Sequence, residues 1–563
     1  MRNLQYHTDL CVVGGGMSGL CCAIAAARHG IKVVLIQDRP VLGGNASSEI
    51  RMWIGGAHGK DNRETGIMEE IFLENFYQNP GLKFPLWDSV LYEKAKAEEN
   101  LTLLLNSTCL DAIIDGDRIV SVKAWQTNAE TFHTVTATYF ADCSGDSILA
   151  PLSGAEFMYG REAKADFDER IPPDSADRKT MGMSCLFQIR ETDHPVPFTP
   201  PTWAYTYESD ADLPYKDHHK DDNFWWIELG GEWDCIHDTD RCRDELLKIC
   251  YGVWDHMKNK GDHGVENWEM EWIGFLPGKR ESRRYVGKYI VTQNDVEAEG
   301  RFDDLVAYAG WSMDDHFPEG FYYTKGYPTI FHPAPQPWGL PLRCMISKNI
   351  SNLVFAGRNI SVTHAALSST RVMATCGILG QALGTAVAQA IQSDCKVENV
   401  DVPMLQQTLM EDDCYLPWHT RELPELTKNA KCNADVVRNG CDRGEENLWI
   451  GNEGDSICYT FDCDTTVREI RLVFDSDLNR NYHNMPCNYP LVQTKFKLPK
   501  TLIRAYRIEG IDQNGTVVES IEVNDCHQRF VRHSVNWSVR EVRFIPLATH
   551  GCYAFRVFDF EIK

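Results

Sequence analysis

The segment Asp9–Gly19 constrains the fold of this chain more than any other feature. An apolar run, Leu10–Val13, leads directly into Gly14-Gly15-Gly16-Met17-Ser18-Gly19, which has the spacing Gly-x-Gly-x-x-Gly. A strand, a tight glycine turn and a helix N-terminus in this order bind phosphate, because the turn lets backbone N–H groups approach a pyrophosphate. The sequence therefore predicts a dinucleotide site. The expected contacts in this segment are Gly14, Gly16, Met17, Ser18 and Gly19.

The residues that follow supply the context that such a glycine motif requires. Leu20–His29 reads as a helix that stops at Gly30, a residue suited to the left-handed position after a helix. Lys32–Ile36 then reads as a second buried strand. A strand, turn, helix, strand order favours a dinucleotide site over a bare tight turn.

Length and hydropathy limit the class of protein. At 563 residues the chain exceeds one ordinary core, so we expect two or three domains. No segment approaches the roughly 18 uninterrupted apolar residues of a membrane span. The first predicted strand begins close to Met1, which leaves no room for a signal peptide, so we expect a cytoplasmic protein.

Cysteine usage and charge narrow the expected partners. The 20 cysteines are scattered and nowhere form Cys-x-x-Cys, so we expect reduced, structural thiols and no metal site. A net charge of −25 repels polyanions, which argues against nucleic acid and anionic membranes as partners. Composition leaves homo-oligomerisation open.

The end of the second strand departs from the usual dinucleotide pattern. An acid commonly closes this strand and binds a ribose hydroxyl, but here the chain reads Gln37-Asp38-Arg39. The Gln37 amide or the Asp38 carboxylate is expected to take the ribose contact. Further cofactor contacts are expected from Arg39 and from the loop after it, at Gly43, Gly44, Ser48 and Arg51.

Two distant segments complete the expected cofactor site. Asn352–Ile360 reads as a buried strand that ends at Gly357 and Arg358, and residues 370–388 read as a helix of small residues. The N-terminus of such a helix would stabilise negative charge on a cofactor. Gly145 and Asp146, in the segment Ala141–Asp146, are expected to lie beside the same cofactor.

These segments together resemble the FAD dependent oxidoreductase family, relatives of fumarate-reductase and heterodisulfide-reductase-A type flavoproteins. The likeness covers roughly residues 6–395, and Pro277–Arg284, Gly326–Pro328 and Pro341–Arg343 add to it. The resemblance implies FAD as cofactor and an α/β Rossmann-like FAD-binding domain of the glutathione-reductase type. It also implies an inserted α+β substrate domain.

The predicted domain order follows from changes of pattern along the chain. We expect the first part of the FAD-binding domain at 1–160, a substrate or cap domain at 161–340 and the FAD return segment at 341–395. A helical linker at 396–432 would lead to a C-terminal all-β sandwich at 433–563, where apolar and polar residues alternate. This last part resembles a discoidin-like sandwich.

Oxidation of an alcohol needs a base that takes the hydroxyl proton while hydride passes to flavin N5. His364 lies between the return strand and the following helix, so it is the leading candidate, although a structural histidine is the competing interpretation. Arg371 is expected to hold an oxygen of flavin or substrate. The secondary candidates are Arg51, His58 and His316. Trp311, Trp225 and Trp226 suit either sugar recognition or core packing.

The resulting hypothesis is an FAD-dependent oxidoreductase that oxidises a small polar, carbohydrate-derived alcohol, with an unidentified electron acceptor. One alternative is a flavin-dependent reductase of an activated double bond, in which Arg280, Arg283 or Arg371 would serve. Another is a glycan-binding or tRNA-modifying protein in which flavin is secondary; the net charge of −25 opposes the tRNA version.

Overall fold

The computed structural model describes residues 1–486 and 497–563, and contacts within it divide the chain into two units. The first unit is built on Met1–Ala57 and Leu82–Val400. The second is built on His58–Gly81, Asp401–Asn484 and residues 497–563. Residues 58–81 thus group with the C-terminal part, whereas the sequence analysis assigned 1–160 to one domain.

A seven-stranded sheet forms the centre of the first unit. Strand β1 (Arg2–Val13) lies between β2 (Val33–Ile36) and β6 (Thr131–Asp142), and both pairings are parallel. The remaining strands are β3 (Leu101–Leu104) parallel to β2, β18 (Leu353–Phe355) parallel to β6, and the antiparallel pair β4 (Ser107–Asp115) and β5 (Arg118–Gln126). This arrangement confirms the expected Rossmann-like α/β fold.

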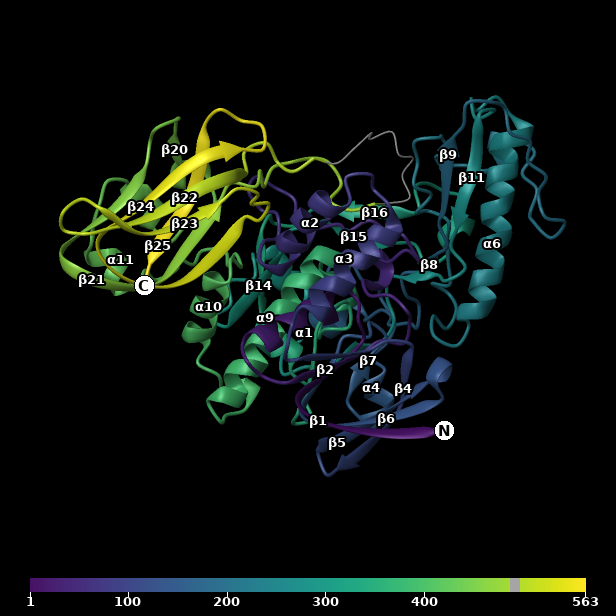
Figure 1. Ribbon diagram of the computed structural model, residues 1–563. Coiled ribbons are helices and arrows are strands. Elements are labelled where there is room, and N and C mark those ends of the chain that lie inside the picture. The colour runs from purple at the N-terminus through teal and green to yellow at the C-terminus, as the bar shows by residue number, and fades with distance from the viewer. Residues whose placement is uncertain (487–496) are drawn as a thin grey trace. The chain divides into compact units, whose positions relative to one another are not determined.

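Two helices, α1 (Met17–Arg28) and α9 (Met373–Gln392), pack closely against each other in this unit (Figure 1). A Cβ at Gly380 would lie 2.0 Å from the Ser18 carbonyl oxygen, and one at Gly384 would lie 2.2 Å from that of Cys22. Glycine is therefore required for this approach. Helix α9 is long and apolar enough to cross a membrane by length and composition, but 94% of its apolar window is buried inside the protein.

The return segment differs in detail from the sequence expectation. The predicted helix over 370–388 is interrupted at Arg371 and Val372, so that a short helix α8 (His364–Thr370) precedes α9. The Thr363 hydroxyl accepts from the Ala366 N–H and caps α8. His364 consequently lies in the first turn of a helix and not in an open loop.

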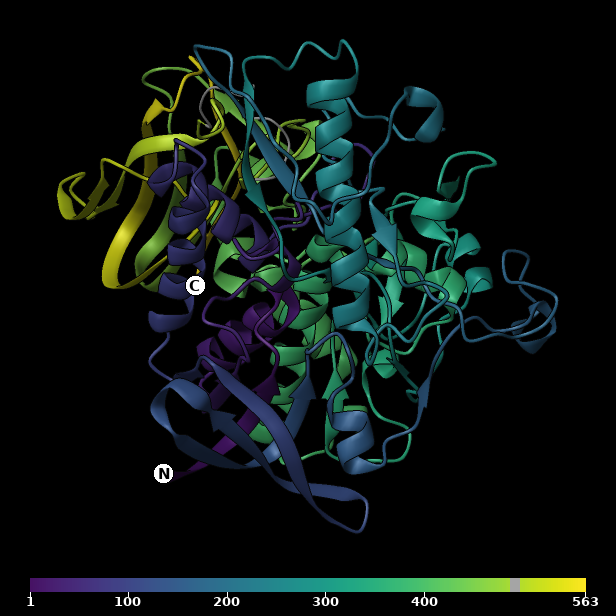
Figure 2. The same cartoon turned by 90° about the vertical axis from the view of Figure 1, so that its right-hand side faces the viewer.

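The inserted region of the first unit is α+β, as expected. Helix α6 (Thr239–Asp255) packs with β9 (Phe187–Glu191) and β11 (Trp268–Ile273) around an aromatic core (Figures 1 and 2). Phe187 and Phe224 stack there at 4.1 Å between ring centroids. Residues 202–207 of this region lie in a loop, and within residues 224–231 only the short strand β10 (Glu228–Leu229) forms.

The second unit contains an all-antiparallel sheet, which confirms the expected all-β C-terminal region. Its strands are β19 (Lys431–Cys432), β20 (Trp449–Gly451), β21 (Ile457–Phe474), β22 (Ile503–Ile511), β23 (Val517–Val523), β24 (Phe530–Thr549) and β25 (Phe555–Ile562). Bulges in the long pair β21 and β24 let the sheet curl on itself. The turn Asp512–Gly515 joins β22 to β23.

A buried ion pair explains why an N-terminal segment belongs to this second unit. Helix α2 (Ile67–Gln78) carries Glu69, which accepts from both terminal nitrogens of Arg480 at 2.6 and 2.7 Å. Both side chains are almost fully buried. Because leaving either charge alone would be costly, the pair fixes α2 within this unit.

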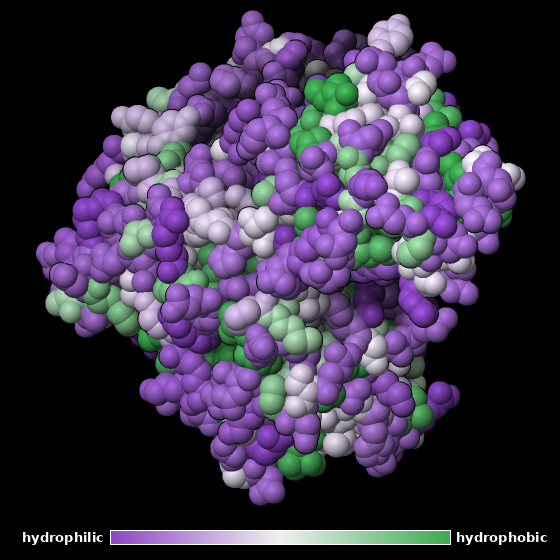
Figure 3. Space-filling view, turned by 90° about the vertical axis from the view of Figure 1, so that its left-hand side faces the viewer, coloured by the Kyte–Doolittle hydropathy of each residue, from purple (hydrophilic) through white to green (hydrophobic). Residues whose placement is uncertain are grey.

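The hydrophilic surface and the free thiols are those expected from the charge and the scattered cysteines of the sequence. The face in Figure 3 is mostly hydrophilic, with hydrophobic residues scattered among polar ones. Every cysteine in the described ranges is free, and most are buried. Burial raises the pKa of the Cys11 and Cys250 thiols well above the usual value, so these groups stay protonated and inert.

Candidate functional site

A cavity of about 620 Å³ lies at the carboxyl ends of the parallel strands in the first unit. Four segments that follow strands line it: Gly14–Ser18 after β1, Ile36–Arg39 after β2, Cys143–Asp146 after β6, and Gly357 and Arg358 after β18. Ligands of open α/β sheets bind at this edge because the loops there converge. The cavity is therefore the candidate functional site.

Glycine is needed at the three positions of the first motif for different structural reasons. Gly14 has a φ of +103°, and a Cβ there would lie 2.6 Å from backbone atoms of Cys143. A Cβ at Gly19 would lie 1.8 Å from the Gly14 carbonyl oxygen, so Gly19 serves packing of α1. A Cβ at Gly16 meets only the Gly44 Cα, at 3.8 Å. Gly16 thus leaves open the space that a pyrophosphate would need.

Gln37, at the end of β2, holds the glycine loop in place. Its amide oxygen accepts from the Gly15 N–H at 2.7 Å, and its amide nitrogen donates to the Val41 carbonyl at 3.1 Å. Asp38 lines the same cavity, with 61% of its side chain exposed. Since Gln37 already makes two hydrogen bonds within the protein, Asp38 is the more available of the two for a ribose hydroxyl.

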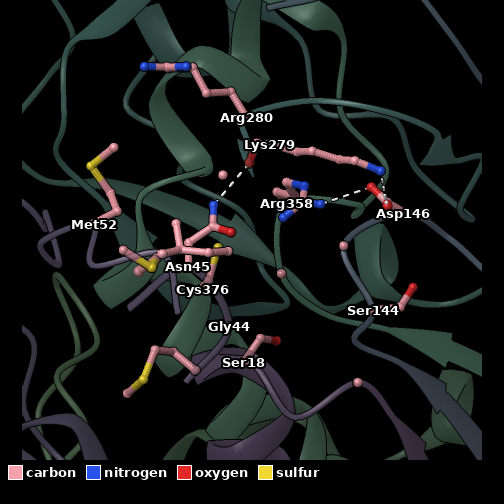
Figure 4. Close-up of a pocket in the computed structure, with 18 of the residues that line it drawn as sticks. Ser18, Gly44, Asn45, Met52, Ser144, Asp146, Lys279, Arg280, Arg358 and Cys376 are labelled. Atoms are coloured by element: carbon pink, nitrogen blue, oxygen red, sulfur yellow. Dashed lines mark hydrogen bonds and ion pairs between the residues drawn. The ribbon is translucent and has the colours of Figure 1, made fainter. Parts of the chain in front are cut away.

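Asp146 forms the centre of a charged cluster in the cavity wall (Figure 4). Lys279 donates to one carboxylate oxygen at 2.8 Å, and Arg358 donates to the other at 2.9 Å. Burial opposes ionisation, but Arg358 and Lys279 hold the pKa of Asp146 far below its usual value. The cluster joins the segments after β6 and β18 to the inserted region, because Lys279 belongs to that region.

The N-termini of α1 and α9 both reach the cavity, and neither helix has a side-chain cap. Several buried polar atoms on lining residues lack a hydrogen-bond partner within the described part of the chain: Ser18 Oγ, Arg358 Nε and Arg371 Nε. Positive helix ends and unsatisfied donors fit an anionic, hydrogen-bonding cofactor. The donor set therefore suits a dinucleotide.

Most of the residues predicted for the site line this cavity. The predicted residues that do so are Gly14, Gly16, Met17, Ser18, Gln37, Asp38, Arg39, Gly43, Gly44, Gly145, Asp146, Gly357, Arg358, His316 and Arg371. Five others are absent from the lining: Gly19, Ser48, Arg51, His58 and His364. His58 is exposed and belongs to the second unit.

Arg51 is held away from the cavity by local contacts. Its guanidinium lies 4.4 Å from the centroid of the Trp272 ring and 4.5 Å from that of Phe84, and it donates to Gln188 at 2.7 Å. The Ser48 N–H donates to Asp88. Both residues therefore support the loop after β2, and cofactor contact from either one stays a prediction.

His364 is buried in an ion-paired network. Its Nδ1 lies 2.9 Å from Glu281 Oε2, and its Nε2 lies 3.4 Å from Asp315 Oδ1. Burial disfavours the charged ring, but Glu281 and Asp315 raise the pKa of His364 to about 10. At neutral pH the ring is thus an imidazolium, which cannot accept a further proton.

We expect this pairing to make the stability contribution of His364 depend on pH. Its folded-state pKa is raised above the ordinary value, so the contribution is complete below about pH 6.5 and is lost as pH rises through about 10. His364→Gln should cost about 3–5 kcal/mol of unfolding free energy near pH 6, and progressively less toward pH 10. Urea unfolding of both proteins at each pH measures the difference. A gap that is constant with pH would contradict the assignment.

His316 lies in strand β15 (Met313–His316) and does line the cavity. Its Nδ1 lies 2.7 Å from Glu228 Oε2, and its Nε2 lies 2.9 Å from a terminal nitrogen of Arg371. Arg371 only donates, so Nε2 is the acceptor and Nδ1 carries the proton. Burial lowers the pKa of His316, so the ring is neutral at pH 7.

Glu228 is ionised and orients this histidine. Burial opposes ionisation, but Arg280 and His316 hold the pKa of Glu228 at about 2. Arg280 lies 3.3 Å from the same carboxylate oxygen, and burial lowers the pKa of Arg280 to about 10. A buried carboxylate that fixes the tautomer of a neutral imidazole is an arrangement suited to general-base chemistry.

Aromatic rings also line the cavity that His316 lines. Trp53, Trp225 and Trp311 line it, and the Trp311 indole N–H donates to Asp314 at 2.6 Å. Trp226, by contrast, packs in the core of the inserted region. The lining also carries more cations than carboxylates: Arg39, Lys279, Arg280, Arg283, Arg358 and Arg371 against Asp38, Asp146 and Asp314.

Sequence reasoning missed several lining residues. Asn45 donates to the Lys279 carbonyl at 3.0 Å (Figure 4), and Ser107–Cys109 reach the cavity from the start of β4. Glu228 was not singled out as a partner of His316, because the two lie 88 positions apart. The available signal was that Ser107 follows the end of β3 by only a short connection, since neighbouring parallel strands end at one edge.

Comparison with known proteins decides the family. The profile of the family described as FAD dependent oxidoreductase matches residues 9–409. The chain belongs to the FAD dependent oxidoreductase family. It is accordingly an FAD-dependent enzyme, and the match spans both cofactor-binding segments and the inserted region.

Individual relatives share much less with this FAD-dependent oxidoreductase. Glycerol-3-phosphate dehydrogenase of Mycobacterium leprae is 36% identical over 66 residues, which are 12% of this chain and only 11% of that enzyme. The solved glycerol-3-phosphate dehydrogenase from Bacillus halodurans complexed with FAD is 15% identical, with a TM-score of 0.22, covering 35% of this chain and 43% of that chain.

A geranylgeranyl bacteriochlorophyll reductase-like protein from Thermoplasma acidophilum is 13% identical, with a TM-score of 0.32, covering 73% of this chain and 84% of that chain.

Proposed function

We propose that this enzyme oxidises an alcohol group of a small, polar, carbohydrate-like substrate. The observation that carries the proposal is His316, which lines the cavity that also contains the glycine loop and is oriented by the buried Glu228. The short likeness to glycerol-3-phosphate dehydrogenase, an enzyme named for a polar alcohol, is consistent with it. Two-electron oxidation is the chemistry that FAD supplies when bound.

We assign the cofactor to the segments that follow the parallel strands. The N–H groups at the start of α1, beside Gly16 and Ser18, would hold the pyrophosphate. Asp38 would hold the adenosine ribose, and the cluster of Asp146, Lys279 and Arg358 would line the middle of the cofactor. The N-terminus of α9 would stabilise negative charge on the flavin ring.

The proton of the substrate hydroxyl passes to His316 Nε2 in this proposal. Glu228 holds Nδ1–H and stabilises the imidazolium that forms, while Arg371 shifts its donated hydrogen bond from Nε2 to the substrate oxygen. The role of base, expected for His364, goes to His316 because His364 is already protonated. His364 then supports the site through Glu281 and Asp315.

The aromatic end of the cavity suits a substrate with alternating apolar and hydroxyl-bearing faces. Trp53 and Trp311 lie 5.8 Å apart between ring centroids, and Asn223 and Asp314 line the same region. Flat rings pack against C–H faces, and polar groups bind hydroxyls. The excess of cations in the lining also suits a substrate that carries an anionic group. We further propose that the protein acts in the cytoplasm, without nucleic acid or membrane partners.

Reduction of an activated double bond is the second candidate. Arg371 lines the cavity, and burial lowers its pKa, which suits a proton donor. Arg280 is the neighbouring cation that would bind a substrate carboxylate.

Anaerobic titration of the purified holoenzyme separates the two candidates. The panel contains free sugars, glycosides, glycerol 3-phosphate, hydroxy acids and enoates, and the readout is flavin absorbance. We expect a polyol or sugar derivative to bleach the flavin. If no alcohol bleaches it and an enoate reoxidises chemically reduced enzyme, the second candidate replaces the first.

A further inference from the structure

Three histidines and one aspartate meet in the inserted region, outside the cavity. Asp210 and His218 belong to the loop before β10, His256 directly follows α6, and His263 lies in the next loop. One nitrogen of each ring and one Asp210 oxygen all lie within 4.8 Å of one another. Three imidazoles and a carboxylate form a donor set that divalent transition metals favour.

The distances from Asp210 to the three histidines are close to those of a tetrahedral metal site. Asp210 Oδ1 lies 2.9 Å from His256 Nε2, 3.4 Å from His218 Nε2 and 3.7 Å from His263 Nε2. Zinc bonds of about 2.0–2.1 Å at tetrahedral angles place neighbouring ligand atoms about 3.3 Å apart. The observed values lie on both sides of that distance.

The positions of the three imidazole rings also agree with a tetrahedral metal site. Each imidazole centroid lies about 1.1 Å behind its bonding nitrogen, so rings on a tetrahedral zinc have centroids about 5.2 Å apart. The three centroid distances among His218, His256 and His263 are 5.1, 5.1 and 4.8 Å. The rings are therefore arranged around a common point.

The opposite ring nitrogens are oriented by backbone carbonyls. His218 Nδ1 donates to the Lys216 carbonyl at 2.5 Å, and His256 Nδ1 donates to the Tyr207 carbonyl at 3.0 Å. Such bonds fix the tautomer that leaves Nε2 as a ligand. The buried Nε2 of His263 has no hydrogen-bond partner within the described residues, although it points to the same cluster.

We propose that Asp210, His218, His256 and His263 bind one Zn²⁺ ion in a structural site of the inserted region. The Asp210 side chain is 75% exposed, which gives the ion a path of entry. The sequence predicted no metal site because it contains no Cys-x-x-Cys motif, whereas these ligands are dispersed over more than fifty positions.

The site would tie the loop before β10 to the end of α6. A π-helical turn, His256–Lys260, follows α6 and contains the ligand His256. The loop that contains His218 continues to Asn223 and Trp225, which line the cavity. A bound ion would thus restrain the segment that leads to the substrate end of the cavity.

Metal analysis of the full-length protein tests this proposal. After zinc loading and dialysis against a weak chelator, we expect about one zinc per chain in the wild type, and at least about a tenfold loss in His256→Ala and His263→Ala. His219→Ala is the matched control, because His219 is exposed, adjacent to His218 and outside the cluster. It should retain the ion.

The cobalt spectrum of the wild type is a second readout, and it does not depend on any variant being well folded. Wild-type protein loaded with Co²⁺ should show the visible bands of tetrahedral cobalt, and added Zn²⁺ should remove them. As a third readout, strong chelation should lower the Tm of the wild type and of His219→Ala, but not that of His256→Ala. Absence of stoichiometric zinc and of tetrahedral cobalt bands in the wild type would overturn the proposal.

Discussion

Gly16→Val is expected to yield folded protein without FAD. A Cβ at this position meets no protein atom closer than the Gly44 Cα, at 3.8 Å, so the backbone there has room for a side chain. The added side chain would instead fill the space beside the N-terminus of α1 that a pyrophosphate needs. Losing two hydrogen bonds to a charged group, at about 1.5–3 kcal/mol each, would weaken FAD binding about 10²- to 10⁴-fold.

Flavin absorbance per chain after gel filtration, together with a thermal melt, measures this outcome. Gly19→Val is the matched comparison, because its Cβ would lie 1.8 Å from the Gly14 carbonyl oxygen and should damage the fold itself. We expect a near-wild-type Tm for Gly16→Val and a clearly lowered Tm for Gly19→Val. Full FAD occupancy in Gly16→Val would show that the glycine loop does not hold the pyrophosphate.

His316→Asn is expected to slow reduction of the flavin by substrate about 10²- to 10⁴-fold, the usual contribution of a positioned base. FAD should stay bound, because the glycine loop and the Asp146 cluster are unchanged. In the wild type the rate should rise with pH through a group titrating below 6.5 and then level off, since burial lowers the pKa of His316.

Stopped-flow bleaching across pH checks both points. His332→Asn is the control, because His332 lies on the paired strand β16 (Thr329–His332) and does not line the cavity. Glu228→Gln adds a test of the pair: Glu228 raises the pKa of His316, so its removal should move the profile to lower pH. A His316 variant with wild-type rate and profile would show that His316 is not the base.

The local parts of the FAD site could be predicted because they are encoded in short segments. The strand, glycine turn and helix from Leu10 to Arg28 are contiguous, and so are β18 and its Gly357-Arg358 end. Spacing alone predicts which of these residues would face a phosphate, because a turn geometry depends on a few neighbouring φ and ψ angles. The family and the cofactor followed from these segments.

The pairings of the two candidate histidines could not be predicted in the same way. His364 was favoured for its place in the chain. However, Glu281, 83 positions away, raises the pKa of His364 and so keeps its ring protonated. Glu228 reaches His316 from 88 positions away, and the proposed zinc ligands converge from the segment before β10 and from the segment that follows α6. Sequence spacing carries no signal for contacts of this kind.

The sequence by itself determined the cofactor class, the α/β core and the all-β C-terminal region. Only the tertiary structure decided which histidine is neutral at the cavity and which is locked as a cation. The physical reason is that the proton affinity of an imidazole depends on burial and on charges within a few ångströms. Those neighbours are brought together by the fold, while the phosphate-binding turn is already complete in the order of the residues.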